Sequence, residues 1–220
     1  CSAPPGAART TTIGEQRATN PLLAAPDEDA FVRTLLDSLG SYPAYFGRLG
    51  ELNRRGPAVL SGTPGLAPLT VEQVVGLQGE GAQVIDARPI TEFAAGHVPG
   101  SLSIELRAAF ATWLGWLTDP TRPVVIVRNP DQDPDEIVWQ ALKVGVEQLA
   151  GELGGGLAAW QAAGGTVRSL PLIEAAHADP TRVVDIRQRN EFAAGHLPGA
   201  RNAELATVST AGLTGPLQTI

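Results

Sequence analysis

The chain has 220 residues, a formal net charge of −7 and a pI near 5.0. This acidic balance argues against a nucleic-acid or anionic-membrane partner, because both require a basic face. One cysteine and three histidines are present. This inventory excludes a disulfide within the chain and a zinc site made of several cysteines. No apolar run approaches the roughly 18 residues of a membrane span.

The first residues suggest a processed protein or a fragment, because the chain begins with Cys1 and not with methionine. The opening Cys-Ser-Ala-Pro-Pro-Gly would also suit a bacterial lipoprotein anchored through Cys1, which is the alternative to a cytoplasmic protein. Residues 1–20 predict irregular structure. Asp27 then predicts the N-cap of a helix that reaches Ser38, and a second helix is expected over 44–54. Each helix has one apolar face, so we expect both to dock on something.

From about residue 66 onwards, strand and helix patterns alternate. Thr70 and Gln73 predict a capping box at the start of a helix, and residues 123–127 form the clearest central strand. We expect Gly154 to Gly156 to form a tight turn, and the four tryptophans to lie mostly in helix cores. The other expected elements are strands at 84–87, 102–104 and 146–149 and helices at 90–95, 107–117, 134–144 and 157–163. The alternation predicts an α/β unit with a mostly parallel sheet.

Residues 84–100 recur at 183–199 with a single offset of 99 residues. The block 92–97, Glu-Phe-Ala-Ala-Gly-His, matches 191–196 letter for letter, and an Asp-x-Arg pair precedes each block. A fixed offset without slippage predicts two copies of one folding unit. The second copy, which begins near residue 166, has about half the length of the first. Half of such a unit should leave its central strands unpaired, and we expect residues 206–220 to be poorly ordered or covered by a partner.

The repeated motif resembles that of rhodanese-like (sulfurtransferase) domains: Asp-x-Arg at a strand end, followed by Glu-Phe-x-x-Gly-His-x-Pro-Gly. The run 154–160, Gly-Gly-Gly-Leu-Ala-Ala-Trp, is similar to a Gly-Gly-x-x-x-Trp element near the end of such domains. The likeness implies a three-layer α/β domain with a central, mostly parallel sheet at 66–165. A partial second copy would follow at 166–220.

The first 60 residues carry a narrower resemblance. The runs Thr-Thr-Thr-Ile-Gly-Glu at 10–15, Asn-Pro-Leu-Leu at 20–23 and Asn-Arg-Arg-Gly at 53–56 look like the end of a metallo-β-lactamase-fold hydrolase fused to rhodanese domains. The persulfide dioxygenases and glyoxalase-II-like proteins form this group. Residues 1–60 would then be a helical remnant of the hydrolase domain. The resemblance implies an iron or zinc site only upstream of this chain, and no cofactor within it.

The loop after the strand at 123–127 should carry the chemistry that the resemblance implies. Rhodanese chemistry uses a cysteine thiolate held by backbone N–H groups at a helix start. This loop has no cysteine, and Pro130 within it and Pro134 directly after it remove N–H donors. Its carboxylates suit the helix dipole but would repel a thiosulfate or persulfide anion. We therefore predict a degenerate, non-catalytic loop made of Arg128, Asn129, Pro130, Asp131, Gln132 and Asp133. In the second copy, the 99-residue offset places the equivalent loop near position 227.

The repeated polar residues predict scaffold, with catalytic or metal-binding roles as the less favoured interpretation. We expect hydrogen bonds that pin each strand end to the turn after it, with both repeated histidines in hydrogen-bonded turns. His177, in a polar connection, has no expected role. The residues of this structural motif are Asp86, Arg88, Glu92 and His97 in the first copy and Asp185, Arg187, Glu191 and His196 in the second.

Three functions remain open from the sequence. The first is the non-catalytic rhodanese-like portion of a sulfur-metabolism fusion protein, whose parent would act on sulfane-sulfur small molecules. The second is a stand-alone binding or scaffold module without enzymatic activity. The third is a sulfurtransferase whose cysteine lies outside this chain. A homo-oligomer is the expected protein partner.

Overall fold

The computed structural model describes residues 10–43, 45–56, 59–62, 64–214 and 218–219. Its largest sheet has five parallel strands in the order β1-β5-β4-β2-β3. The strands are β1 (Pro68–Leu69), β2 (Gln83–Asp86), β3 (Leu102–Ser103), β4 (Val124–Val127) and β5 (Leu149–Leu153). The β-branched strand β4 lies at the centre and is buried along its whole length. The alternation of strand and helix thus gives the parallel α/β sheet expected from the sequence.

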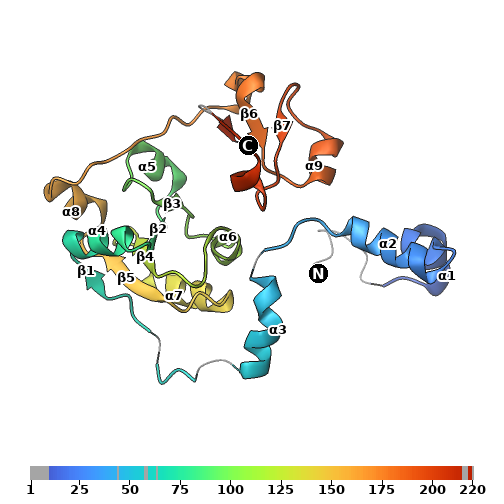
Figure 1. Ribbon diagram of the computed structural model, residues 1–220, viewed down its shortest axis with the longest axis horizontal. Helices are drawn as coiled ribbons and strands as arrows, with labels where there is room; N and C mark the ends of the chain where they lie inside the picture. The colour runs from blue at the N-terminus through green and yellow to red at the C-terminus, as the bar shows by residue number, and fades with distance from the viewer. Residues whose placement is uncertain (1–9, 44, 57–58, 63, 215–217, 220) are drawn as a thin grey trace.

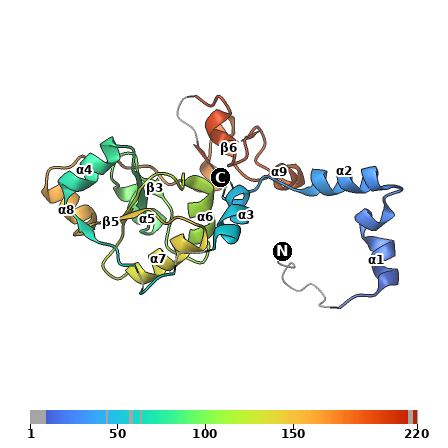
Figure 2. The ribbon, with the colours of Figure 1, turned by 60° about the horizontal axis from the view of Figure 1, so that its bottom comes forward.

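Helices cover both faces of this sheet and produce three layers, as Figure 2 shows. The elements are α4 (Val71–Gly79), α5 (Ile90–Ala95), α6 (Phe110–Leu117), α7 (Pro134–Lys143) and α8 (Gly156–Ala162). On one face, Phe110 and Leu114 of α6 and Ile137 of α7 pack on the sheet. On the other face, Val74 of α4 and Trp160 of α8 complete a second cluster. Successive side chains of a β-strand point to opposite faces of the sheet, so the strands contribute side chains to both cores.

A second, smaller sheet follows along the chain (Figure 1), with three parallel strands in the order β7-β6-β8. Its elements are β6 (Val183–Asp185), α9 (Arg189–Ala194), β7 (Arg201–Asn202), η4 (Val208–Thr210) and β8 (Gln218–Thr219), preceded by η2 (Ala175–His177) and η3 (Pro180–Arg182). We call the five-stranded part the first unit and this part the second unit. The central strand β6 is buried at all three positions.

The expectation that the second unit leaves its central strands unpaired is wrong for β6, although β8, the counterpart of the central strand β4, has a neighbour on one side only among the described residues. Strand β8 lies beside β6, just as β4 lies beside β2, so β6 has a neighbour on each side. The expectation of disorder over 206–220 falls partly outside the described residues, at 215–217 and 220. Within the described part, η4 and β8 are regular elements. A short segment can complete the sheet because β8 needs to add only backbone pairing at one edge.

The pairing of β8 also corrects the position deduced from the 99-residue offset. Val84 pairs with Val125, whereas its counterpart Val183 pairs with Gln218 and not with position 224. The connection into β8 is therefore six residues shorter than the connection into β4. In this register, the counterpart of Arg128 falls at position 221, not near 227. The offset holds for the strand-end motif but fails across the next connection.

The N-terminal segment contains α1 (Ile13–Thr19), η1 (Pro21–Ala24), α2 (Glu28–Ser38) and α3 (Phe46–Arg55). The expectation of irregular structure over 1–20 is wrong for α1, where the Thr12 side chain caps the helix, and residues 1–9 lie outside the described part. The docking expected of both helices is made mainly by residues beside them. Tyr45, just before α3, packs against the first unit's core, and Gln188 of the second unit donates to Ser41 O after α2, but neither helix has a buried residue of its own. Figure 1 shows α1 and α2 extending away from both sheets.

Two expectations within the first unit are also wrong. The strand predicted at 146–149 is β5 at 149–153, because Gly145 turns with a φ of 74° and Val146 closes the end of α7 through a bond to Ala141 O. Trp113 and Trp139 were expected in helix cores but are 37% and 46% exposed. The buried faces of their helices are made by smaller apolar side chains. None of the described helices is long and apolar enough to cross a membrane.

Candidate functional site

The strand order places the candidate loop at the switch point of the first sheet. From the middle of the sheet, β3 lies on one side of β2 and β5 lies on the other side of β4. In open α/β sheets, ligands bind beyond the carboxyl ends of the strands at such a point. The loop 128–133 follows β4 there, beside Ala87 and Arg88 at the end of β2. This is the position where a rhodanese-like domain would carry its chemistry.

The guanidinium group of Arg128 lies within the loop itself. Its Nη1 donates to the carbonyl oxygens of Asn129 and Gln132 at 3.1 and 2.9 Å. Its Nε and Nη2 donate to the two carboxylate oxygens of Glu152 on β5. Both side chains of this pair are less than one fifth exposed. Arg128 is the single cationic residue of the loop 128–133. Its guanidinium group is therefore engaged by a carboxylate and two carbonyl groups of the protein.

Further hydrogen bonds close the loop. The side chain of Gln132 accepts from Asn129 N at 2.8 Å and donates to Ala87 O at 2.7 Å. The amide of Asn129 donates through Nδ2 to Glu92 at 2.9 Å, and Asp133 caps α7 by accepting from Asp135 N. The backbone N–H groups of Asn129, Gln132 and Asp135 thus all have partners within the loop or the helix start. A ligand that needed these donors would have to displace protein groups.

The exposed side of the loop is acidic. Pro130, Asp131 and Asp133 of the loop are exposed, as are Asp135 and Glu136 in the first turn of α7. Pro130 has no N–H to donate. Carboxylates at a helix start stabilise the helix dipole and oppose the approach of an anion. The predicted loop residues therefore lie together at one site, and that site presents negative charge.

In the first unit, the strand-end motif forms a buried network. Arg88 donates through Nε and Nη2 to the two carboxylate oxygens of Asp86 at 2.9 and 2.6 Å. The same Nη2 donates to Gly96 O at 2.8 Å, which joins the end of β2 to the turn after α5. His97 Nδ1 lies 2.9 Å from Phe93 O, and the two rings stack at 3.9 Å. The Nδ1–H tautomer satisfies this carbonyl, which points to a role in the turn.

In the second unit, the motif repeats the same bonds in a more exposed setting. Arg187 donates to both carboxylate oxygens of Asp185 and to Gly195 O at 2.9 Å. His196 Nδ1 lies 2.8 Å from Phe192 O. The hydrogen bonds from Arg187 lower the pKa of the Asp185 carboxyl, and Asp185 raises the pKa of Arg187. The Arg187 side chain is 39% exposed, compared with 6% for Arg88.

The other residues singled out in the sequence make fewer contacts with the loop and the two strand-end motifs. Glu92 contacts Asn129 of the loop, whereas Glu191 accepts from Gln188 N in a local capping box. His177 is exposed and lies 3.8 Å from Glu174. Within the described residues, no group of three or more His, Cys, Asp or Glu side chains could hold a metal ion. The structure does not bring the three histidines together.

Sequence reasoning missed two polar residues that organise these sites. Glu152 is a single charge in the otherwise apolar strand 149–153, and that contrast was the signal that a partner existed. Asn202 donates to Asp185 O and Arg187 O and fixes the second motif from β7. A cavity of 720 Å³ adjoins this end of the second unit. It is lined by residues 37–41, 188–190, 202–204, 207, 210 and 211.

The model of the rhodanese-like domain family matches residues 70–163 and 171–218. The chain belongs to the rhodanese-like domain family. The two matched stretches contain both copies of the strand-end motif. The family therefore accounts for the repeat, for the parallel sheets and for the loop at the carboxyl end of β4.

Solved structures resemble the chain at low sequence identity. A rhodanese-like domain from Anabaena is 22% identical, with a TM-score of 0.41, and the match covers 51% of this chain and 86% of that domain. A thiosulfate sulfurtransferase from Pseudomonas aeruginosa is 22% identical, with a TM-score of 0.37, covering 72% of this chain and 36% of that one. A metallo-β-lactamase from Staphylococcus aureus is 17% identical, with a TM-score of 0.48, covering 65% and 40%. A comparison with curated proteins finds no significant match.

Proposed function

We propose that the chain is the non-catalytic rhodanese-like portion of a sulfur-metabolism fusion protein of the persulfide dioxygenase or sulfurtransferase type. The observation that carries this proposal is the Arg128 guanidinium, which is held by Glu152 and by two carbonyl groups of its own loop. In a working loop, an arginine and the backbone N–H groups would face the sulfur anion. Here the guanidinium and the N–H groups of Asn129 and Gln132 are engaged by the protein.

The chemistry of sulfur transfer supports the same conclusion. A sulfane sulfur is accepted by a thiolate, and a thiolate needs positive charge or free N–H donors around it. The loop 128–133 has no cysteine, its N–H groups are engaged at Asn129 and Gln132, and it presents the carboxylates of Asp131 and Asp133. The missing cysteine and the engaged N–H groups of Asn129 and Gln132 together support inactivity of the first unit.

The proposed role of the first unit is architectural. Residues 1–60 would be the end of a hydrolase domain, 66–165 the first rhodanese-like domain and 166–220 the beginning of a second. The first domain would space its neighbours and contribute to a homo-oligomer. The parent would act on sulfane-sulfur small molecules in the cytoplasm, where thiols stay reduced.

An iron or zinc centre of the parent would belong to the hydrolase domain and not to this chain. Such a centre needs several histidines and carboxylates in one cluster. His97 and His196 are stacked on Phe93 and Phe192, each with Nδ1 on a carbonyl group. The residues present here do not fit a catalytic metal.

A thiosulfate-to-cyanide assay tests the proposed inactivity. The chain has one cysteine, so Cys1→Ser removes its only thiol. We expect the wild-type chain and the C1S variant to show the same background formation of thiocyanate. The variant R128M opens the loop, and we expect it to remain inactive because no nucleophile is exposed. Turnover by the wild-type chain that C1S abolishes would overturn the proposal and favour a competent sulfurtransferase.

The coding sequence around this chain tests the fusion. A His-x-His-x-Asp-His cluster upstream of Cys1 would support the parent that we propose. A strand followed by cysteine at about position 221, where the β8 register places the counterpart of Arg128, would support it further. A start codon and a stop codon at the present ends would contradict the fusion and favour a stand-alone binding module.

A further inference from the structure

The chain between α2 and α3 contacts both units. Tyr45 packs on the first unit's core, with its ring against Gly115 of α6. Ser41 O accepts a hydrogen bond at 3.3 Å from Nε2 of Gln188, the N-cap residue of α9 in the second unit. Pro43, which lies between these two contacts, is buried. Figures 1 and 2 show this part of the chain passing beside α6 and α9.

We call residues 40–43 and Tyr45 the brace, and each of its two contacts is made at a glycine. A Cβ atom added to Gly40 would overlap the side-chain amide of Gln188, and one added to Gly115 would overlap the Tyr45 ring. Neither glycine has a φ in the left-handed region, so the backbone requires glycine at neither position. Glycine within a helix such as α6 also lowers its stability relative to alanine. The close approach of the brace is the feature that calls for both glycines.

The covalent connection between the units is poorly suited to fixing their orientation. Residues 171–182 are exposed at every position except Ala178. Relative motion is the default behaviour of domains joined by an exposed segment, unless a large apolar interface holds them. A fixed orientation therefore needs contacts from elsewhere in the chain, and the brace supplies contacts with both units.

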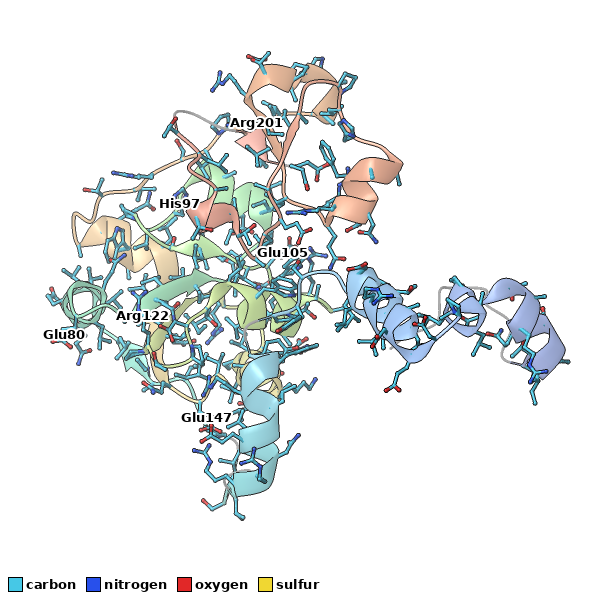
Figure 3. All side chains as sticks on the ribbon, turned by 45° about the vertical axis from the view of Figure 1, so that its right-hand side comes forward. Glu80, His97, Glu105, Arg122, Glu147 and Arg201 are labelled. Carbon is cyan, nitrogen blue, oxygen red and sulfur yellow. The ribbon has the colours of Figure 1, made fainter. Side chains whose placement is uncertain are left out.

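The brace meets the second unit at a particular end of its sheet. Gln188 directly follows Arg187 of the strand-end motif, so its contact lies at the carboxyl end of β6. On the first unit's side, Trp113 of α6 lies at the same end, because it lines one cavity together with Ile186. Figure 3 labels Glu105, another residue on the first unit's side of this cavity. The brace and α6 thus both adjoin the edge at which the strands of the second sheet end.

We propose that the brace holds the second unit in one orientation relative to the first, with the carboxyl end of β6 beside α6. The N-terminal segment is then part of the junction between the two rhodanese-like units. Loss of either contact frees the second unit to move on its exposed connection. This inference goes beyond the proposed function, because it holds whether or not any part of the chain transfers sulfur.

Amide NMR of the full ¹⁵N-labelled chain tests the brace. Residual dipolar couplings in a weakly aligning medium report the orientation of each unit, and ¹⁵N relaxation reports the motion of the Ser41 amide. For the wild-type chain, we expect one alignment tensor to fit the amides of both sheets. The order parameter of Ser41 should be about 0.85, the value of rigid backbone.

The variants Gly40→Val and Tyr45→Ala each break one contact of the brace. G40V displaces the side chain of Gln188 and removes its bond to Ser41 O, whereas Y45A withdraws the ring from α6. Each variant should require separate alignment tensors for the two units. In G40V, the order parameter of Ser41 should also fall below about 0.6, the range of flexible backbone. Unchanged amide spectra of β4 and β6 will verify that both units remain folded.

The matched control is Gly47→Val in α3. Gly47 has open space around it and a φ outside the left-handed region, so the variant adds a side chain two residues after the brace without meeting a neighbour. G47V should keep the single tensor of the wild-type chain. Three results would overturn the proposal: separate tensors in the wild-type chain, a single tensor that survives in G40V or Y45A, or a separation in G47V equal to that in G40V.

Discussion

The buried ion pair of the first unit permits a quantitative test of the strand-end motif. Asp86 has no exposed surface, and Arg88 supplies two charged hydrogen bonds to its carboxylate. Arg88→Met leaves that carboxylate buried without its counter-charge, and leaves Gly96 O without its donor. Breaking a buried pair from one side costs about 3–5 kcal/mol. Two charged hydrogen bonds at about 1.5–3 kcal/mol each give about 3–6 kcal/mol, which overlaps this range.

Urea unfolding followed by tryptophan fluorescence measures this loss. All four tryptophans lie in the first unit, and residues 166–220 contain neither Trp nor Tyr, so the signal follows the first unit. We expect R88M to lower its free energy of unfolding by about 3–5 kcal/mol. The matched variant R187M, in the second unit, should leave this transition unchanged within about 0.5 kcal/mol.

A companion variant separates the lost charge from lost packing. D86N/R88M removes the orphaned carboxylate, so it should be more stable than R88M alone by about 1–3 kcal/mol. A loss below about 1 kcal/mol for R88M, which is the value of an exposed ion pair, would refute the argument from burial. An equal loss in the single and the double variant would show that packing is the cause.

Three further predictions follow from other contacts. Gly151→Ala should destabilise the first unit by at least about 2 kcal/mol in the same urea assay, because an added Cβ would meet Ala67 O at 2.3 Å at a φ of 144°. Trp160→Phe removes the bond from Nε1 to Thr166 O and should cost about 1 kcal/mol, with faster amide exchange at Arg168 and Leu170; unchanged exchange would contradict this. The lowered pKa of Asp185 gives the second unit stability that is fully present above the unfolded pKa of about 3.9 and is lost as pH falls through the lower folded pKa. An acid titration of the Val184 amide by NMR should show this loss at a higher pH in R187M, and identical profiles would contradict the assignment.

The features that the sequence predicts correctly are those encoded over short distances. The capping box of Thr70 and Gln73 needs only four consecutive residues, and both of its hydrogen bonds are present. The alternation of strands and helices likewise follows from local patterns and leads to the parallel sheet. The Asp-x-Arg pair and the turn after it lie within twelve residues. Their hydrogen bonds form in both copies for the same local reasons.

The features that the sequence leaves open depend on distant segments. Arg128 is recognisable as a loop residue, but its partner Glu152 comes from a neighbouring strand. The exposure of Trp139 depends on which face of α7 meets the sheet, and Ile137, Val138 and Ala141 occupy that face. The six-residue shortening before β8 lies in a connection without a repeated motif, where nothing in the sequence fixes the register.

The two copies of the turn separate what a motif encodes from what its surroundings add. The six identical residues produce the same stacking of phenylalanine on histidine, at 3.9 and 3.7 Å. Yet His97 is 6% exposed, whereas His196 lies on the surface. Arg168 and Leu170, whose backbones bond to His97 and Ala94 in the first unit, are not part of the repeated block. Identical residues therefore establish the geometry of both turns, while the burial of each turn depends on segments outside the repeated block.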